Sequence, residues 1–321
     1  MVHRRRPAPG DRGSGDRAAR LVTVVGEALV DIVDDGSPRE IPGGSPANVA
    51  LGLGRLGVPV EFVTWLGDDA RGQHVADHLR ASGVSLADGA FGASRTSTAA
   101  VRCAPDGQPS YDLALEWDLP VVPEVPDRLH VGSVGAFLRP GADAVLELTR
   151  RTAAAGGRVS FDPNVRPALF DDAAGARARF DLLAIHADVV KLSDEDAAWL
   201  FPGASTDVVL DRLHALGVRL AVLTAGAAGS VLSTVRDRVR VLSERVDVVD
   251  TVGAGDSYTA ALLWQLDGPA SQLDALQRSD LTELGLVSAR AAAMTVGRRG
   301  ADLPTADEVL SVARGPLDGG P

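Results

Sequence analysis

The chain has 321 residues, of which 45% are hydrophobic, and a formal net charge of −11. This length suits one large domain or two small ones with a full apolar core. An acidic chain of this kind is a poor nucleic-acid binder, and its single cysteine excludes an internal disulfide framework and a thiolate metal cluster.

The first 20 residues differ in charge from the rest. They contain six arginines and two aspartates, a net +4, so the other 301 residues carry −15. Residues 1–20 are rich in Gly, Pro and Arg without periodicity, which predicts a disordered basic tail or, alternatively, a polyanion-binding arm. Glu27 and Asp31 interrupt the apolar stretch that follows. Because no apolar run reaches about 18 residues, we expect neither a membrane span nor a secretory signal, and the sequence predicts a cytoplasmic protein.

From residue 21 onward, short apolar or β-branched runs alternate with stretches of helical spacing. The predicted strands are residues 22–25, 61–65, 130–134, 158–162, 189–192 and 220–224. The predicted helices include residues 75–79, 144–152, 197–200 and 208–216. This alternation predicts one α/β domain over residues 21–321, with a mostly parallel central sheet and helices on both faces. Ligands of such sheets bind beyond the carboxyl ends of the strands.

Two stretches break the alternation, at about residues 27–42 and 94–118. Both show strand-like alternation around Asp-Gly turns, and no helix joins their strands. They predict a small antiparallel β lid at the edge of the sheet. Because a sheet of this size is marginal alone, we expect it to pack over a substrate, a second subunit or both. A homodimer formed through the lid is therefore predicted.

A first glycine motif, GGSPANVA, occupies residues 43–50. Ser45 is expected to cap a helix, Pro46 to lie in its first turn, and Asn48 to point from that turn. A helix that opens after Gly43 and Gly44 exposes N–H groups beside an amide side chain, which suits sugar hydroxyls. The alternative is a well-capped helix without a ligand.

The sequence GLGRLG at residues 52–57 has the spacing of a dinucleotide-binding fingerprint. That fingerprint must follow a strand and open a helix, whereas this one lies inside a predicted helix. Gly52 and Gly54 are expected to allow close helix packing, and Gly57 to end the helix. A Rossmann dehydrogenase is therefore disfavoured.

A second glycine motif, DTVGAGDS, occupies residues 250–257. The valine-rich run at 246–249 predicts a strand before it, and helical spacing after it predicts a helix that begins at the glycines. Such a helix start binds anions through its free N–H groups, and Asp256 beside it could serve as a base. The alternative is that Asp250 and Asp256 only cap a tight turn. The predicted anion ligands are the N–H groups of Gly253, Ala254 and Gly255.

Lys191 is the only lysine of the chain, and no Gly-Lys-Ser/Thr sequence surrounds it. Walker A phosphate loops require that sequence, and protein kinases require a strand lysine with a His-Arg-Asp loop. Both architectures are excluded. A phosphoryl-transferring chain of this composition must hold phosphate with backbone amides and arginine.

The two glycine motifs, with four further segments in order, resemble those of the ribokinase-like (PfkB) carbohydrate kinases over about residues 21–305. The further segments are GEALVD at 26–31, DPNVRP at 162–167, SDED at 193–196 and TAGAAGS at 224–230. Residues 295–301 resemble the stretch where relatives bind adenine. The resemblance implies a three-layer α/β/α fold and an ATP-dependent sugar kinase, and the motif wording is closest to fructokinase-like members.

The resemblance also implies roles for individual residues. Sugar ligands would be Asp31, Gly43, Gly44, Asn48 and Asp256, the last as general base. Catalysis would further use Arg166 and the backbone of Gly253, Ala254 and Gly255. The nucleotide would contact Ser193, Thr224, Gly226, Gly229, Gly253, Gly255 and Gly300. Magnesium would lie near Asp196 and Glu195, where the family's Asn-x-x-Glu has become Ser-Asp-Glu-Asp, and a monovalent cation such as potassium near Asp250.

Charge narrows the choice of substrate. Relatives that act on 2-keto-3-deoxygluconate offer a lid arginine, whereas residues 111–118 read YDLALEWD, with three carboxylates and no arginine. An anionic substrate would be repelled, although Arg102 and Arg166 make that exclusion incomplete. A neutral hexose is favoured, fructose first. The alternatives are ribose or a nucleoside, 2-keto-3-deoxygluconate, or a catalytically silent sugar-binding regulator of the same fold.

Overall fold

The computed structural model describes residues 20–34, 38–103, 109–119, 124–170 and 172–311. The expected disordered tail, except its last residue, lies outside these ranges. Within them, no helix is long and apolar enough to cross a membrane.

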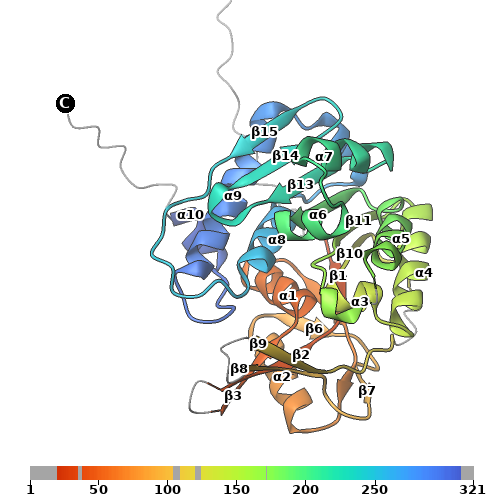
Figure 1. Ribbon diagram of the computed structural model, residues 1–321, viewed down its shortest axis with the longest axis vertical. Helices are drawn as coiled ribbons and strands as arrows, with labels where there is room; N and C mark the ends of the chain where they lie inside the picture. Colours follow the sequence, from red (N-terminus) through yellow and green to blue (C-terminus); the bar gives the residue numbers. More distant parts are fainter. Residues whose placement is uncertain (1–19, 35–37, 104–108, 120–123, 171, 312–321) are drawn as a thin grey trace, which may run out of the picture.

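A nine-stranded sheet forms the middle layer, in the order β15-β14-β13-β12-β11-β10-β1-β4-β6 (Figure 1). All neighbours pair parallel except β13–β14 and β14–β15, which pair antiparallel. The predicted mostly parallel α/β sheet is confirmed. Its strands are β1 (Val22–Val25), β4 (Val60–Val63), β6 (Val84–Leu86), β10 (Arg128–Gly132), β11 (Arg158–Asp162), β12 (Val189–Ser193), β13 (Leu220–Thr224), β14 (Ser230–Ser233) and β15 (Arg238–Val241).

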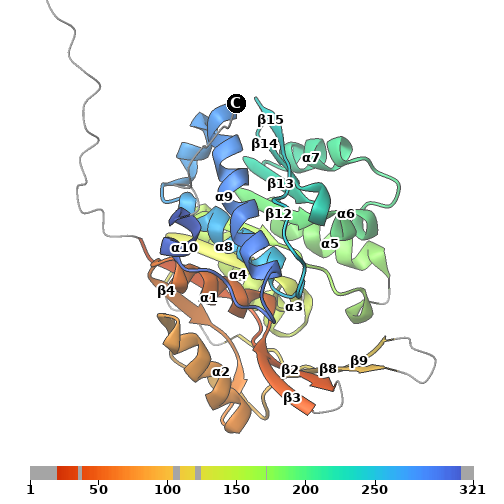
Figure 2. The ribbon, with the colours of Figure 1, turned by 90° about the vertical axis from the view of Figure 1, so that its left-hand side faces the viewer.

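Helices cover both faces of this sheet (Figures 1 and 2). One layer comprises α4 (Gly141–Ala154), α5 (Ala173–Ala184), α6 (Asp194–Leu200) and α7 (Thr206–Ala215). The other comprises α1 (Ser45–Arg55), α2 (Ala70–Ala81), α8 (Ala254–Gln265) and α9 (Arg278–Val296). Every residue of β1 is buried, and its alternate valines enter the two layers, which explains why central strands read as continuous apolar runs. Shorter helices are α3 (Ser133–Phe137), α10 (Ala306–Ser311), η1 (Pro167–Leu169), η2 (Gly226–Ala228) and η3 (Ala270–Ala275).

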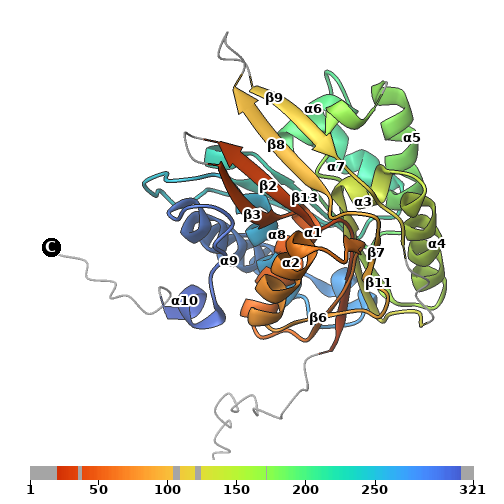
Figure 3. The same ribbon diagram turned by 90° about the horizontal axis from the view of Figure 1, so that it is seen from below.

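A second sheet forms a lid that projects from the body (Figures 2 and 3). Its order is β3-β2-β8-β9, and its strands lie at the two segments that interrupt the alternation in the sequence. The pairs β2–β3 and β8–β9 are antiparallel, whereas β2 and β8 pair parallel. The lid is therefore two antiparallel hairpins joined by one parallel pair. Its strands are β2 (Leu29–Asp34), β3 (Pro38–Gly43), β8 (Thr98–Cys103) and β9 (Pro109–Ala114), and a separate two-stranded sheet pairs β5 (Leu66–Gly67) with β7 (Phe91–Ala93).

The glycines at 52–57 behave as expected. A Cβ atom on Gly52 would lie 2.7 Å from the Cβ of Ala260, so this glycine allows α1 to pack closely on α8. Gly57 follows the end of α1 with φ +80°. These residues belong to a packed helix and its termination, and they do not form a nucleotide loop.

Four local predictions are wrong. Residues 246–249 form no strand, because β15 ends at Val241 and no neighbouring strand pairs with this segment, whose backbone instead donates to the carbonyl of Val296. The valine-rich composition alone does not make a strand. The predicted strands 61–65 and 130–134 extend too far, because β4 ends at Val63 and β10 ends at Gly132, just before α3 begins at Ser133. Ser45 does not cap α1, since Gly44 is the N-cap and no side chain bonds to the helix start.

Candidate active site

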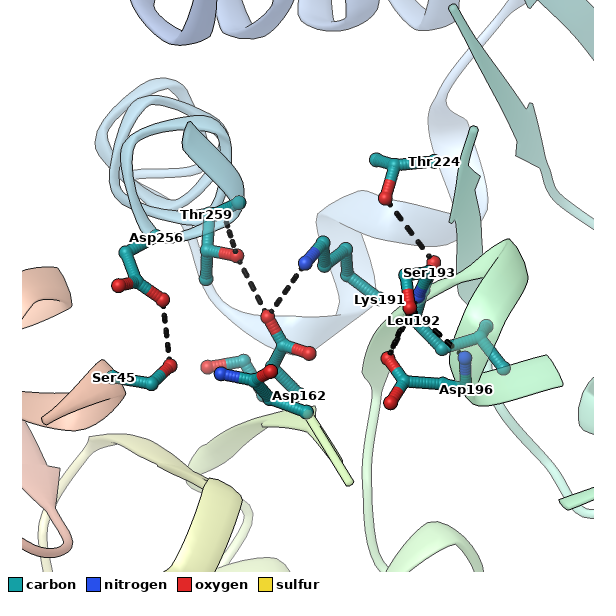
Figure 4. Close-up of polar contacts among 12 residues, drawn as sticks. Ser45, Asp162, Lys191, Leu192, Ser193, Asp196, Thr224, Asp256 and Thr259 are labelled. Atoms are coloured by element: carbon teal, nitrogen blue, oxygen red, sulfur yellow. Dashed lines mark hydrogen bonds and ion pairs between the residues drawn. The ribbon is translucent and has the colours of Figure 1, made fainter. Parts of the chain in front are cut away.

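Asp256 lies in the first turn of α8 and faces the first turn of α1. Its Oδ1 accepts a hydrogen bond from the Ser45 hydroxyl at 2.6 Å (Figure 4). Its Oδ2 accepts a hydrogen bond from the Asn48 amide at 2.8 Å. The Ser45 hydroxyl, which was expected to cap a helix, donates to this carboxylate instead. Burial raises the pKa of Asp256, and the hydrogen bonds from Ser45 and Asn48 act in the opposite direction. The starts of two helices therefore meet at one buried carboxylate.

The backbone before α8 turns sharply at Gly253, the N-cap of the helix, with φ +78°. A Cβ atom there would lie 2.7 Å from the Cβ of Ala301, so the residue needs to be glycine for two separate reasons. Asp250 does not cap α8: its Oδ2 accepts from the N–H of Gly300 at 2.9 Å and its Oδ1 from that of Val252 at 3.1 Å. Asp250 thus ties the segment before α8 to the loop after α9.

The root of the lid carries the expected sugar ligands. Asp31 lies on β2, where it pairs with Ile41 of β3, and a Cβ atom on Gly43 at the end of β3 would lie 2.2 Å from its Oδ2. Gly44 has φ +103°, and a Cβ atom there would lie 2.7 Å from the carbonyl oxygen of Glu27. Burial raises the pKa of Asp31 to about 6. The positive charge of Arg166 acts to lower this pKa, and the negative charge of Asp256 acts to raise it. The two glycines let the start of α1 approach this carboxylate.

Arg166 follows β11 and supplies a positive charge on the same side. Its Nη1 donates to the side-chain oxygen of Asn164 at 2.6 Å and to the carbonyl oxygen of the same residue at 3.1 Å. No carboxylate of the described residues forms an ion pair with it, and its charge partly opposes the rise that burial causes in the pKa values of Asp31 and Glu27. The guanidinium is therefore available to an anion beside the carboxylates.

The expected nucleotide residues lie at neighbouring strand ends. Ser193 ends β12 and pairs in register with Thr224, which ends β13. After β13 the backbone adopts left-handed conformations at Gly226 and Gly229, and a Cβ atom on Gly229 would lie 2.1 Å from the carbonyl oxygen of Val241. Gly300, after α9, also has a positive φ of +66°. Of these three glycines only Gly226 is exposed, so the turn that directly follows β13 places exposed backbone at the carboxyl end of that strand.

Asp196 is engaged with the backbone. Its Oδ2 accepts from the N–H of Ser193 at 2.9 Å and from its hydroxyl at 2.8 Å, and its Oδ1 accepts from the N–H of Val165 at 2.7 Å. Ser193 and Asp196 form a capping box that starts α6, while Glu195 is exposed. In the part of the chain that is described, no three His, Cys, Asp or Glu side chains are grouped to hold a metal ion.

Three buried polar residues near the site, Lys191, Thr259 and Glu27, were not predicted. Lys191 on β12 donates to Oδ2 of Asp162 at 2.9 Å, and the Thr259 hydroxyl donates to the same oxygen at 3.0 Å (Figure 4). A lysine between the valines and the leucine of a buried strand was the available signal. Glu27 is also buried, which raises its pKa to about 7, and its Oε2 accepts from the N–H of Gly135 at 2.8 Å.

The charge argument from residues 111–118 needs correction. β9 ends at Ala114, so Glu116 and Asp118 lie beyond the lid strand. Glu116 accepts from the N–H of Ser94 at 2.8 Å, and Asp118 accepts from the N–H of Leu119 at 2.8 Å. The side chain of Asp112 lies outside the described residues. The described carboxyl groups that lie near the expected sugar ligands are therefore those at the root of the lid.

A mostly parallel sheet between two helical layers, a lid at its edge and a glycine-started helix beside a buried aspartate define an α/β sugar kinase of the ribokinase-like class. The chain belongs to the pfkB family of carbohydrate kinases, whose family model matches residues 19–308.

Individual relatives agree with this assignment. The chain is 34% identical over 265 residues to a fructokinase of Rhizobium leguminosarum bv. trifolii, covering 77% of this chain and 79% of that one. A fructokinase of Xylella fastidiosa, solved with bound ATP, superposes with a TM-score of 0.80 at 28% identity, covering 92% and 98% of the two chains. The aminoimidazole riboside kinase of Salmonella enterica, solved with its riboside and an ATP analogue, superposes with a TM-score of 0.76 at 28% identity, covering 91% and 99%.

Proposed function

We propose that this carbohydrate kinase is a cytoplasmic enzyme that transfers the γ-phosphoryl group of ATP to a hydroxyl of a neutral sugar, with fructose as the favoured substrate. The observation that carries the proposal is the buried carboxylate of Asp256, held by Ser45 and Asn48 at the glycine-started N-terminus of α8. Fructose is supported by the relatives named fructokinase.

Each part of the site has a proposed role. Asp256 accepts the proton of the attacking hydroxyl, while the N–H groups at residues 253–255 and the guanidinium of Arg166 stabilise charge on the transferring phosphoryl group. Because the transition state of phosphoryl transfer is loose, correct positioning matters more than the basicity of Asp256. The sugar is held by Asp31, Gly43, Gly44 and Asn48.

The nucleotide is proposed to lie along the carboxyl edge of the sheet. Its contacts would be Ser193, Thr224, Gly226, Gly229 and Gly300, with its terminal phosphates at Gly253 and Gly255.

Magnesium fits the donors present, because it is held by one or two carboxylates together with phosphate oxygens and water. Exposed Glu195 offers a direct carboxylate, whereas Asp196 already accepts three hydrogen bonds and would act through water. The ion would neutralise phosphate charge; a potassium site would adjoin Asp250.

The charges at the root of the lid favour a neutral substrate. Asp31, Asp256 and Glu27 contribute three buried or half-buried carboxyl groups, against the single guanidinium of Arg166. A sugar acid such as 2-keto-3-deoxygluconate would meet more negative than positive charge.

A riboside remains the second candidate substrate, because the chain is similar to an aminoimidazole riboside kinase. A catalytically silent regulator is the third candidate, because Ser193 and Asp196 differ from the residues of the family motif. Such a protein would show no magnesium-dependent ATP consumption with any sugar.

The affinity for the sugar should depend on pH through Asp31. Its pKa of about 6 means that the carboxylate is protonated as pH falls and then loses capacity to accept hydrogen bonds from sugar hydroxyls. We expect the KM for fructose to rise about tenfold between pH 7 and pH 5, with a smaller change in kcat. Initial rates across this range test it. Asp31→Asn should raise KM at pH 7 and remove most of its pH dependence, whereas a wild-type KM that is constant over this range would exclude the role.

The lid is proposed to form a homodimer. It projects from the body as only four strands, and a sheet of this size gains stability when a second surface covers it (Figure 3). Sedimentation velocity at micromolar concentration should give about twice the 33.2 kDa mass of the chain. A species of the single-chain mass under these conditions would contradict the lid dimer.

A further inference from the structure

The buried ion pair between Lys191 and Asp162 is not explained by stability. Their side chains are 7% and 3% exposed, and the Nζ–Oδ2 distance is 2.9 Å. Removing two charges from water costs several kcal/mol per ion, and apolar residues of similar volume are often equally stable at such positions. The neighbours of Lys191 along β12 are Val190 and Leu192, so an apolar side chain would suit the strand. A charged pair at this place suggests a function.

The pair contacts the turn of α8 that carries Asp256. The Thr259 hydroxyl donates to the same Asp162 oxygen as Lys191, and a Cβ atom built on Gly255 would lie 3.3 Å from the lysine Nζ. Thr259 follows Asp256 by three residues, so both lie on one side of the helix. Oδ1 of Asp162 has no hydrogen-bond partner among the described residues. The ammonium is thus held against the start of α8 by a single carboxylate oxygen.

Around this one ammonium lie three buried carboxyl groups, those of Asp162, Asp196 and Asp256. After burial, which raises the pKa of Asp256, the negative charge of Asp162 raises it further and the positive charge of Lys191 lowers it. The other charged groups near Asp256 are on the sugar side: the half-buried carboxyl of Asp31, with Glu27 and Arg166 beyond it. The two members of the ion pair on β11 and β12 therefore have opposite effects on the pKa of Asp256.

We propose that Lys191 and Asp162 are positioning residues that set the protonation state of the catalytic base: Lys191 favours the ionised form of Asp256 in its buried site, and Asp162 fixes the ammonium against α8 while its own charge acts on Asp256 in the opposite direction. The proposal rests on the role of Asp256 as the base. It assigns a function to the only lysine of the chain, one that is separate from binding of the sugar.

The test is the pH profile of kcat at saturating fructose and ATP-Mg, which reports groups of the substrate complex and avoids the effect of Asp31 on KM. In Lys191→Met the acid limb should move to higher pH by about one unit or more, the usual effect of losing an opposite charge at close range. In Asp162→Asn it should move to lower pH. In the double variant, which removes both charges, it should return close to the wild-type position. Lys191→Arg, which keeps the positive charge, should leave the limb close to the wild-type position.

Two outcomes would overturn the proposal: an acid limb that stays in place in the folded Lys191→Met enzyme, or limbs that move in the same direction in both single variants. If Lys191→Met does not fold, the Asp162→Asn and double variants decide, because an unshifted limb in the Asp162→Asn variant also contradicts it. Failure of this proposal is distinct from failure of the base itself. An inactive Asp256→Asn enzyme with unmoved limbs in the pair variants would keep the base and remove the role of the pair.

Discussion

Asp256→Asn is expected to lower kcat by roughly 10²–10⁴, the range for loss of a general base, with little change in the KM for the sugar. The asparagine can still accept from the Ser45 hydroxyl, but its amide would oppose the amide of Asn48, which now donates to Asp256. This mismatch costs about 1 kcal/mol, too little to unfold the protein. Steady-state kinetics and thermal unfolding of the purified variant give both numbers.

Asp77→Asn is the matched control, because it makes the same chemical change at an exposed position on α2. Its kcat should equal that of the wild type. An Asp256→Asn enzyme with near-normal kcat would remove Asp256 from the catalytic role, whatever the control shows. A fall in stability without a fall in kcat would assign the residue to joining α1 and α8.

Gly253→Ala is expected to damage the anion site at the start of α8. The left-handed φ of +78° costs an alanine about 1–2 kcal/mol, and its Cβ would lie 2.7 Å from that of Ala301, so backbone must move. That movement redirects N–H groups that stabilise the transferring phosphoryl group, and losing one such donor typically costs 10²–10³ in kcat. We expect kcat to fall by at least about 10² and the free energy of unfolding by about 1–3 kcal/mol.

Gly57→Ala separates strain from site damage. Gly57 has nearly the same φ, +80°, but nothing lies within 4 Å of its added Cβ, and it follows the opposite end of α1. Its replacement should lower stability by about 1 kcal/mol and leave kcat unchanged. Equal kcat values for the two alanine variants would show that the backbone at Gly253 does not serve catalysis.

The sequence predicts the central sheet well because its strands are buried on both faces and therefore read as short apolar runs. It also predicts the start of α8, since two glycines before an apolar helical pattern are a local signal. Local signals fail where the partner is distant in the chain. Ser45 looks like a cap, yet it bonds to Asp256, 211 residues away. The valines at 246–249 have the composition of a strand, but no neighbouring strand pairs with them.

The pairing of Lys191 with Asp162 could not be predicted either. The two residues are 29 positions apart and meet because β11 and β12 are neighbours in the sheet, an order that local patterns do not specify. Trp117 falls within the predicted lid segment 94–118 but lies beyond β9 and is buried, with its Nε1 donating to the carbonyl of Gly135 at 3.0 Å. The motifs thus predict candidate residues of the site, whereas the buried polar contacts that hold them become visible only in the fold.

The most direct test is coupled ADP release from ATP and magnesium, with and without potassium, across fructose, ribose, glucose, adenosine and 2-keto-3-deoxygluconate. We predict the highest kcat/KM with fructose and little turnover of the sugar acid. Highest turnover with 2-keto-3-deoxygluconate would contradict the charge argument from Asp31, Asp256 and Glu27, and preference for ribose or adenosine would contradict the choice of a hexose. No ADP release with any of the five would contradict the assignment of a neutral-sugar kinase that favours fructose.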